Sequence, residues 1–290
     1  MSDLARALDL NSKTGISVRL AETPAEIAAA QNVRYRVFYK EQGAIPTAEM
    51  AKLERDFDLY DQVADHLIVS DPSLGSGTEN VVGTYRLMRA EHIAQLGKKE
   101  FYSSAEYDLT TINNCGAKLL ELGRSCVLPE YRTRHVLNHL WEGIALYLAE
   151  HQIDLMFGCG SLHGTDADAI GEQLSYLYYY HMAPRALRPR AHESVYVPMK
   201  RHEQDYIQAN AKNIFMQLPP LIKGYMRVGA VVGDGAYIDH QFNTTDVSIV
   251  MPTYLLTDKY LRHFERKTQK NITFRSPFAE ALESMFQENA

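Results

Sequence analysis

The sequence is poor in cysteine, which excludes a disulfide framework. Its three cysteines, Cys115, Cys126 and Cys159, are an odd number without the spacing of a metal motif. We interpret each of them as a small apolar side chain of the core. A reducing cytoplasm is the compartment that fits this usage best.

Long apolar runs are also lacking. No window approaches the roughly 18 consecutive apolar residues that a membrane-spanning helix needs, and the opening stretch MSDLARALDL has no apolar core of a secretory signal. We therefore expect a cytoplasmic protein whose only membrane role would be peripheral, on the inner membrane. The charged tail at residues 261–290 is the candidate for such contact, although its apolar face is thin.

An excess of positive charge is absent as well. The chain carries 36 acidic and 30 basic residues, and its formal net charge is -6 at pH 7. This balance gives no general attraction for a phosphate backbone, and the sequence contains no recognisable nucleic-acid-binding module. Nucleic acid is therefore not an expected partner.

Apolar residues make up 46% of the 290 residues, enough to bury a sizeable core. Alternating apolar residues predict a strand at 16–21, and Thr23 followed by Pro24 predicts the start of an amphipathic helix. Two further strands, separated by a turn-rich stretch, predict a hairpin at 65–90. A long strand at 117–128 is expected to stop at Pro129.

The second half of the chain continues this alternation of strands and helices. The expected elements are a helix at 135–152, a strand at 153–161, a helix from Thr165 to Pro184, a short helix ending near Gly229 and a last strand at 244–254. This order predicts an α+β fold in which a mixed sheet is covered by helices. We expect a single domain over residues 1–290, with a core at about 16–260 and an insertion at about 160–212.

The stretch LELGRSCV places two charges inside the long strand. On a regular strand Glu121 and Arg124 would point to opposite faces, and each would need a partner, because an unpaired buried charge is costly. Gly123 between them indicates a bulge, which would open the ladder to a ligand. Two structural ion pairs at a strand end are the alternative interpretation.

Other charges also lie next to apolar residues. Each of them alone is typical of a solvated helix edge, a helix cap or a structural ion pair. Together with Glu121 and Arg124 they supply arginines, which could bind the carboxylate or phosphate of a ligand, and carboxylates, which could bind its amine. These residues are Arg34, Asp58, Asp61 and Arg86.

The motifs RYRVF, DLYD, HLIV, GTYRL and ELGR resemble those of the acyl-homoserine-lactone synthases and their relatives in the GCN5-related N-acyltransferase superfamily. The resemblance implies a splayed mixed central sheet flanked by helices, with an insertion before the last helix and strands. The tryptophan that usually follows the phenylalanine in lactone synthases is absent from YKEQGAIPT. The substrate-binding positions that it implies are Arg34, Phe38, Asp58, Asp61, Arg86 and Arg124, beside Glu121.

A closer resemblance extends over about residues 16 to 264. LELGRSCVLPEYR, LWEGIALYL, MFGCGSLHGTD, LPPLIKGYMRVGA and the pattern from Asp239 to Asp246 are similar to the L-ornithine Nα-acyltransferases. This implies transfer of a 3-hydroxyacyl chain from acyl carrier protein to the α-amine of L-ornithine, giving lyso-ornithine lipid. The acyl-phosphopantetheine of the carrier would be the donor, with no permanently bound cofactor. Glutamine, lysine or glycine as acceptor, a coenzyme-A-dependent acetyltransferase and a non-catalytic binding module stay open.

Within this family Glu121 is the candidate general base, acting directly or through water, and backbone N–H groups near the bulge would stabilise the oxyanion. Arg34 and Arg124 would hold the acceptor carboxylate or the phosphopantetheine, and Asp58 or Asp61 the second amine of ornithine. We expect no covalent intermediate on Cys126 and no metal, because the histidines lack ligand spacing.

The loop after the long strand, YRTRHVL, contains no glycine. Side chains in this loop should hinder the close approach of a coenzyme A pyrophosphate to backbone amides. A carrier protein presents one phosphodiester and an acidic surface, so its binding does not require the close approach of a pyrophosphate to the backbone amides of the loop. We therefore expect Arg132, Arg134 and His135 to contact the carrier or its phosphopantetheine, with ordinary solvated charge as the alternative.

Overall fold

The structure is a computed structural model that describes residues 15–75, 77–253 and 278–287. Its contacts divide the chain into two compact units, and each is described by itself. The described residues of the first unit are 15–75, 77–99 and 120–152, and those of the second are 100–119, 153–253 and 278–287. This division does not test the expected single domain with its insertion, which stays a prediction. Most of the predicted C-terminal tail lies outside the described residues.

The first unit is built on four antiparallel strands. They are β1 (Ser17–Leu20), β2 (Asp65–Ser70), β3 (Val81–Arg89) and β5 (Leu119–Val127), and they pair in that order. The predicted hairpin and the predicted long strand are both confirmed. Burial is continuous along β3 and interrupted only in the middle of β5, where three consecutive residues are half-buried.

The helix α2 (Pro24–Arg34) begins as predicted. The Thr23 hydroxyl accepts a hydrogen bond from the Glu26 N–H at 3.2 Å, while the Glu26 carboxylate accepts one from the Thr23 N–H at 3.1 Å, which is a complete capping box. Beyond Arg34 the helix widens into a π-helix, η1 (Tyr35–Glu41). Segments of this kind are rare and are frequent at functional sites.

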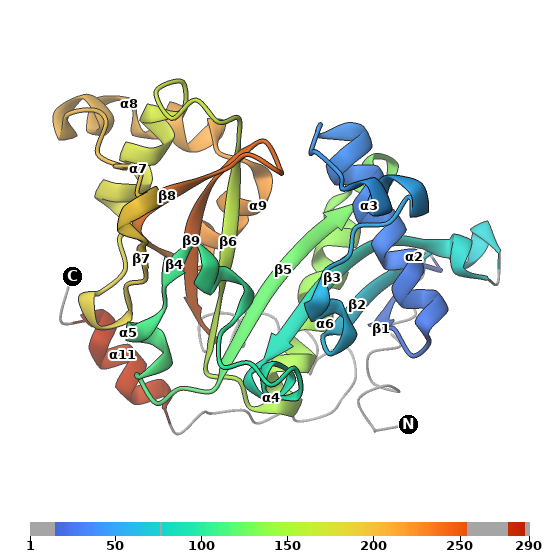
Figure 1. Cartoon of the computed structure of the whole chain (residues 1–290). Coiled ribbons are helices and arrows are strands. Elements are labelled where there is room, and N and C mark those ends of the chain that lie inside the picture. Colours follow the sequence, from blue (N-terminus) through green and yellow to red (C-terminus); the bar gives the residue numbers. More distant parts are fainter. Residues whose placement is uncertain (1–14, 76, 254–277, 288–290) are drawn as a thin grey trace. The chain divides into compact units, whose positions relative to one another are not determined.

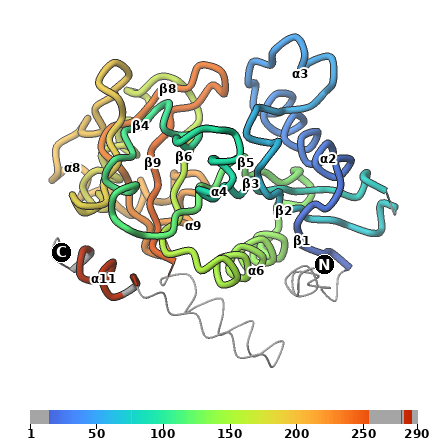
Figure 2. The backbone as a smooth tube through the Cα atoms, turned by 60° about the horizontal axis from the view of Figure 1, so that its bottom comes forward, coloured from blue at the N-terminus to red at the C-terminus, as the bar shows by residue number. Residues whose placement is uncertain are grey.

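Helices cover both faces of this sheet (Figures 1 and 2). Leu67 and Val18 face α6 (Arg134–His151), whose Gly143 packs directly against both. Because side chains alternate along a strand, His66 and Arg86, which lie opposite each other on β2 and β3, face the other side, toward α2. Figure 1 also labels α3 (Ala48–Leu53) and α4 (Ala90–Gln95) of this unit.

A bulge interrupts the pairing of β3 with β5. Thr84 pairs with Cys126 and Arg86 with Gly123, so Arg124 and Ser125 together lie opposite a single residue. The predicted bulge next to Gly123 is confirmed. The residue in the left-handed region is Arg124 itself, with φ of 51°.

The bulge changes the direction of the two strand charges. Glu121 pairs with Met88 and therefore shares a face with Arg86. Arg124 and Arg86 both contact Asp58, so Arg124 is on this face too. The expectation that Glu121 and Arg124 point apart was wrong. The extra residue of the bulge breaks the alternation of side chains and places Arg124 on the same face of the sheet as Glu121.

The described residues of the second unit form five strands, of which one pair is parallel. Their order is β6-β9-β8-β7-β4, and only β7 and β8 run parallel. The strands are β6 (Leu155–His163), β9 (Thr244–Pro252), β8 (Val231–Asp239), β7 (Arg190–Ala191) and β4 (Tyr107–Asp108). With helices beside both sets of strands, the predicted α+β class with mixed strand directions is confirmed.

The helices of the second unit are partly as predicted. They are α5 (Thr110–Asn113), α7 (Gly171–His181), α8 (Gln204–Gln217), α9 (Pro220–Arg227) and α11 (Ala279–Gln287). The predicted start at Thr165 was wrong, because the Asp166 carboxylate accepts the N–H groups of Asp168 and Ala169 in a turn that precedes the helix. Within the part of the chain that the structure describes, no helix has the length and apolarity to cross a membrane.

Close packing of α6 against β1 and β2 gives a testable prediction. A Cβ at Gly143 would lie 2.9 Å from Val18 Cγ1 and 3.3 Å from Leu67, and both of these side chains are fully buried. We expect Gly143→Ala to destabilise the protein by about 1–3 kcal/mol, measured as a lower thermal midpoint. Gly224→Ala, in α9 with nothing within 4 Å, is the control and should be neutral or stabilising. Equal effects of the two variants would contradict this packing.

Candidate active site

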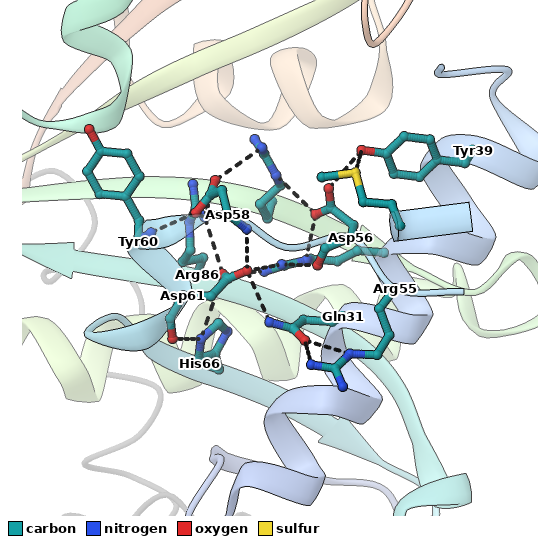
Figure 3. A network of polar contacts seen from close by, with 12 residues as sticks. Gln31, Tyr39, Arg55, Asp56, Asp58, Tyr60, Asp61, His66 and Arg86 are labelled. Atoms are coloured by element: carbon teal, nitrogen blue, oxygen red, sulfur yellow. Dashed lines mark hydrogen bonds and ion pairs between the residues drawn. The ribbon is translucent and has the colours of Figure 1, made fainter. Parts of the chain in front are cut away.

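Three arginines and three aspartates contact one another on the α2 side of the first sheet. Figure 3 labels the three aspartates and one of these arginines, Arg86. The six residues come from the end of α2, from the segment before β2, and from β3 and β5. We call them the Arg–Asp network, which consists of Arg34, Arg86, Arg124, Asp56, Asp58 and Asp61. Five of the six were predicted as substrate-binding residues from the sequence.

Arg34 is the inner member of the network. Its side chain is fully buried, and it donates to Asp61 through Nη1 at 2.9 Å and Nη2 at 2.5 Å. Its Nε lies 2.8 Å from Asp56 Oδ2, and Nη2 also donates to the Asp56 carbonyl. Removing one partner of such a buried pair leaves an uncompensated charge, which costs about 3–5 kcal/mol.

Asp61 is the most heavily hydrogen-bonded carboxylate of the network. Besides Arg34 it accepts from Gln31 Nε2 at 3.1 Å, from the Asp58 N–H at 3.1 Å and from Arg86 Nη1 at 3.2 Å. Burial alone would raise the pKa of Asp61, but the charge and hydrogen bonds of Arg34 and the charge of Arg86 outweigh it and hold that pKa well below its usual range. Asp61 is therefore ionised at neutral pH.

Asp58 and Arg124 form the outer edge of the network. Both carboxylate oxygens of Asp58 accept a hydrogen bond from Arg86 Nη1 at 2.7 Å, and Oδ1 also accepts the Tyr60 N–H at 2.9 Å. The side chain of Asp58 is 21% exposed, compared with 1% for Arg86. Arg124, 13% exposed, reaches Asp58 Oδ2 with Nη2 at 3.4 Å and Asp56 Oδ2 with Nε at 3.1 Å. An approaching molecule would therefore meet one carboxylate and one guanidinium.

Asp56 and Tyr39 were missed from the sequence, as was the Asp61 partner Gln31. Asp56 is fully buried and touches both Arg34 and Arg124. Tyr39, on η1, donates its hydroxyl to Asp56 Oδ1 at 2.9 Å. The alternation in RDFDLYD, which puts Asp56 two residues before Asp58, is the signal that could have identified the first of them. No local pattern marks Tyr39.

The other predicted residues lie around this network or away from it. Glu121 is 2% exposed on β5 and shares the sheet face of Arg86, and Phe38 is half-buried on η1. Arg132 forms a two-pronged ion pair with Glu41 at 2.6 Å and donates Nε to the Val127 carbonyl. It is therefore outside the network. The remaining two, Arg134 and His135, are exposed at the start of α6.

A second polar group lies in the second unit. Carboxylate oxygens of Glu106 and Asp246 and the sulfur of Cys159 lie within 4.8 Å of one another, a spacing that could hold a metal ion. Cys159 Sγ is 3.1 Å from Glu106 Oε2, as expected for a thiol that donates its proton to a carboxylate. A metal would need the thiolate instead. We therefore keep the prediction that no metal is required.

The chain was compared with known proteins. A family model described as an acetyltransferase (GNAT) domain matches residues 33–142. The L-ornithine N(alpha)-acyltransferase of Agrobacterium fabrum is 42% identical over 261 residues, which are 88% of this chain and 87% of that protein. The protein of the same name from Brucella abortus is 41% identical over 270 residues, 92% and 94% of the two chains.

Solved structures give a weaker likeness. The AHL synthase LasI is 9% identical with a TM-score of 0.44, over 83% of this chain and 91% of that one. The curated relatives, in contrast, match nearly the whole chain, so the similarity in sequence extends well beyond the domain that the family model covers.

The ionised state of Asp61 predicts a pH dependence of stability. Its pKa is lowered by folding, so its contribution is present above the unfolded value of about 3.9 and is lost as the pH falls below it. We expect Asp61→Asn to lower the free energy of unfolding at pH 7 and to lose less of it between pH 5 and pH 3 than the wild type does. Denaturant unfolding across this range measures both effects. Asp205→Asn, at an exposed position of α8, is the comparison variant and should change the stability at pH 7 less than Asp61→Asn does.

The Cys159–Glu106 contact predicts that activity needs no bound metal. Dialysis against a chelator should leave the activity unchanged, because a metal bound there would have to displace the thiol proton that Cys159 donates to Glu106. Loss of turnover that added zinc restores would contradict this.

Proposed function

The chain belongs to the L-ornithine Nα-acyltransferases of the GNAT superfamily, and we propose that it transfers a (3-hydroxy)fatty acyl group from acyl carrier protein to the α-amine of L-ornithine. Membership confirms the N-acyltransferase fold expected from the motifs and makes the chain an enzyme of acyl transfer. The observation that carries the choice of acceptor is the identity of 41–42% with relatives of that name over about nine tenths of the chain. The carrier-bound donor and the product lyso-ornithine lipid belong to the proposal.

The outer edge of the Arg–Asp network suits an amino acid with a second amine. A guanidinium fork binds a carboxylate through two parallel hydrogen bonds, and a carboxylate binds an ammonium. Arg124 and Asp58 are joined only by a long contact of 3.4 Å, which an acceptor could replace. Neither would then be left without a partner, because Asp58 keeps Arg86 and Arg124 keeps Asp56.

We propose roles for the other predicted residues on the basis of these contacts. Arg34 and Asp61 form a buried ion pair, so they hold the network together and do not touch the acceptor. Arg86 fixes Asp58. Phe38 on the half-buried side of η1 supplies an apolar wall for the acceptor.

Glu121 is the general base of the proposed reaction. The α-amine is mostly protonated near neutral pH, so it must give a proton to Glu121, directly or through water, before it attacks the thioester carbonyl. The amine nitrogen then forms the C–N bond and the C–S bond breaks. The nitrogen gives its second proton to the leaving phosphopantetheine sulfur, and Glu121 releases the first proton to water. Backbone N–H groups at the bulge of β5, where the ladder is interrupted, would stabilise the oxyanion. No covalent bond to the enzyme is needed.

The start of α6 supports a carrier protein as donor. The loop before it lacks glycine, and its N-terminal amide at Val136 already donates to the Thr133 hydroxyl at 3.3 Å. Arg134 and His135 are exposed there and suit the acidic surface of a carrier. Arg132 would have to exchange Glu41 for the phosphodiester of the phosphopantetheine.

The base assignment predicts the behaviour of Glu121→Gln. General base catalysis typically contributes about 10²–10⁴-fold, so kcat should fall by this order. The deficit should shrink as the pH rises, because more of the acceptor amine is then neutral. Steady-state rates across pH, together with the thermal midpoint as a folding control, measure this. Full turnover of Glu121→Gln at every pH would show that another group accepts the proton.

The donor and the acceptor can be tested with purified protein. We expect N-acylornithine, detected by mass spectrometry, from 3-hydroxyacyl carrier protein and not from the matched acyl-coenzyme A. Arg134→Ala should raise KM for the carrier severalfold and leave KM for ornithine unchanged. Turnover of acetyl-coenzyme A without carrier would favour a small-molecule acetyltransferase, and acylation of glutamine, lysine or glycine in place of ornithine would change the acceptor.

A further inference from the structure

Arg124 is held in a conformation that few side chains adopt. Its φ of 51° at the bulge of β5 is in the left-handed region, which costs a residue other than glycine roughly 1–2 kcal/mol. Such strain persists only where the surroundings determine the conformation, and it is frequent at binding sites. The contacts of the Arg124 guanidinium therefore determine the orientation of this side chain.

Asp56 is the buried contact of Arg124. Its Oδ2 lies 3.1 Å from Arg124 Nε and 2.8 Å from Arg34 Nε, and its side chain is fully buried. Burial alone would raise the pKa of Asp56, but the charges of Arg124 and Arg34 outweigh it and hold the pKa below its usual value. This contact engages Nε of Arg124, while Nη2 reaches the partly exposed Asp58 at the outer edge of the network.

Tyr39 fixes the other oxygen of Asp56. Its hydroxyl donates to Oδ1 at 2.9 Å. Tyr39 and Arg34 are five residues apart, and the i to i+5 spacing of the π-helix brings residues at this separation onto one side, so both reach the same carboxylate. Burial, followed by the charge of Asp56, raises the pKa of Tyr39, so its hydroxyl remains a donor.

We propose that Asp56, with its carboxylate fixed by Tyr39, is a positioning residue that aims the Arg124 guanidinium at the carboxylate of the acceptor amino acid. The inference rests on the proposed function, in which Arg124 binds that carboxylate. It adds a reason for the π-helix: the widened turn puts the Tyr39 hydroxyl where it can orient Asp56. The backbone of Asp56 is also held, because its N–H donates to the Gln31 carbonyl at 3.0 Å.

A double-mutant cycle tests this coupling. KM for ornithine, KM for the acyl donor and kcat are measured for the full chain with Asp56→Asn, Arg124→Gln and both substitutions. We expect each single variant to raise KM for ornithine at least about tenfold with a smaller change in kcat, and Asp56→Asn to change it less than about threefold when Arg124 is already replaced. Effects that multiply in the double variant would overturn the proposal, because Asp56 would then act without Arg124.

Tyr39→Phe is the milder second variant, which removes a single hydroxyl from the carboxylate. It should raise KM for ornithine severalfold in the wild-type background and have no effect beside Arg124→Gln. Gly143→Ala, on the opposite face of the sheet, is the stability control: it should lower the thermal midpoint and leave KM for ornithine unchanged. An unchanged KM in both Tyr39→Phe and Asp56→Asn would overturn the proposal.

The assay separates this inference from the function on which it rests. If the wild type does not acylate ornithine, the proposed function is wrong. If it does but Arg124→Gln raises only KM for the donor, Arg124 does not bind the acceptor, and the role of Asp56 is overturned with that assignment alone.

Discussion

The balance of charge around Arg34 is the constraint on which the candidate active site depends. A guanidinium with no exposed surface lies between Asp56 and Asp61, and these three residues join α2 to the segment that precedes β2. None of them can be removed without leaving a buried charge uncompensated. The same two carboxylates also reach Arg124 and Arg86, so the positions of the strands β3 and β5 are tied to that balance.

The proposed function rests on a difference between the inner and outer parts of the network. The inner charges are fully paired and buried, and they give Asp58 and Arg124 fixed positions at an edge that remains accessible. In the proposed function, a site made in this way would need little rearrangement on binding a zwitterionic acceptor, because each outer group keeps one partner inside the protein. Preorganisation of this kind favours both binding and catalysis. The strained bulge is the local cost of presenting Arg124 there.

The sequence predicted the charges but not all of their geometry. Arginines and aspartates next to apolar residues identified Arg34, Asp58, Asp61, Arg86 and Arg124, and the structure brings all five together. Strand alternation placed Arg124 on the wrong face of the sheet. The glycine predicted that a bulge would occur next to Gly123, but it did not predict to which face the bulge would direct Arg124. Tyr39 was missed because its role depends on a π-helix, which no pattern in RYRVFYKE marks. The strand β8 was missed since its glycines break the alternation, and α8 because its sequence is mostly polar.

The central claim is that this chain joins a fatty acyl group to the α-amine of ornithine. It is tested most directly by mass spectrometry of lipids from a heterologous host that lacks amino-acid lipids, before and after expression of the chain. The account predicts a new lipid whose fragments contain ornithine amide-linked to a 3-hydroxy fatty acid. The absence of any new amino-acid lipid, in cells shown to contain the folded protein, would contradict it.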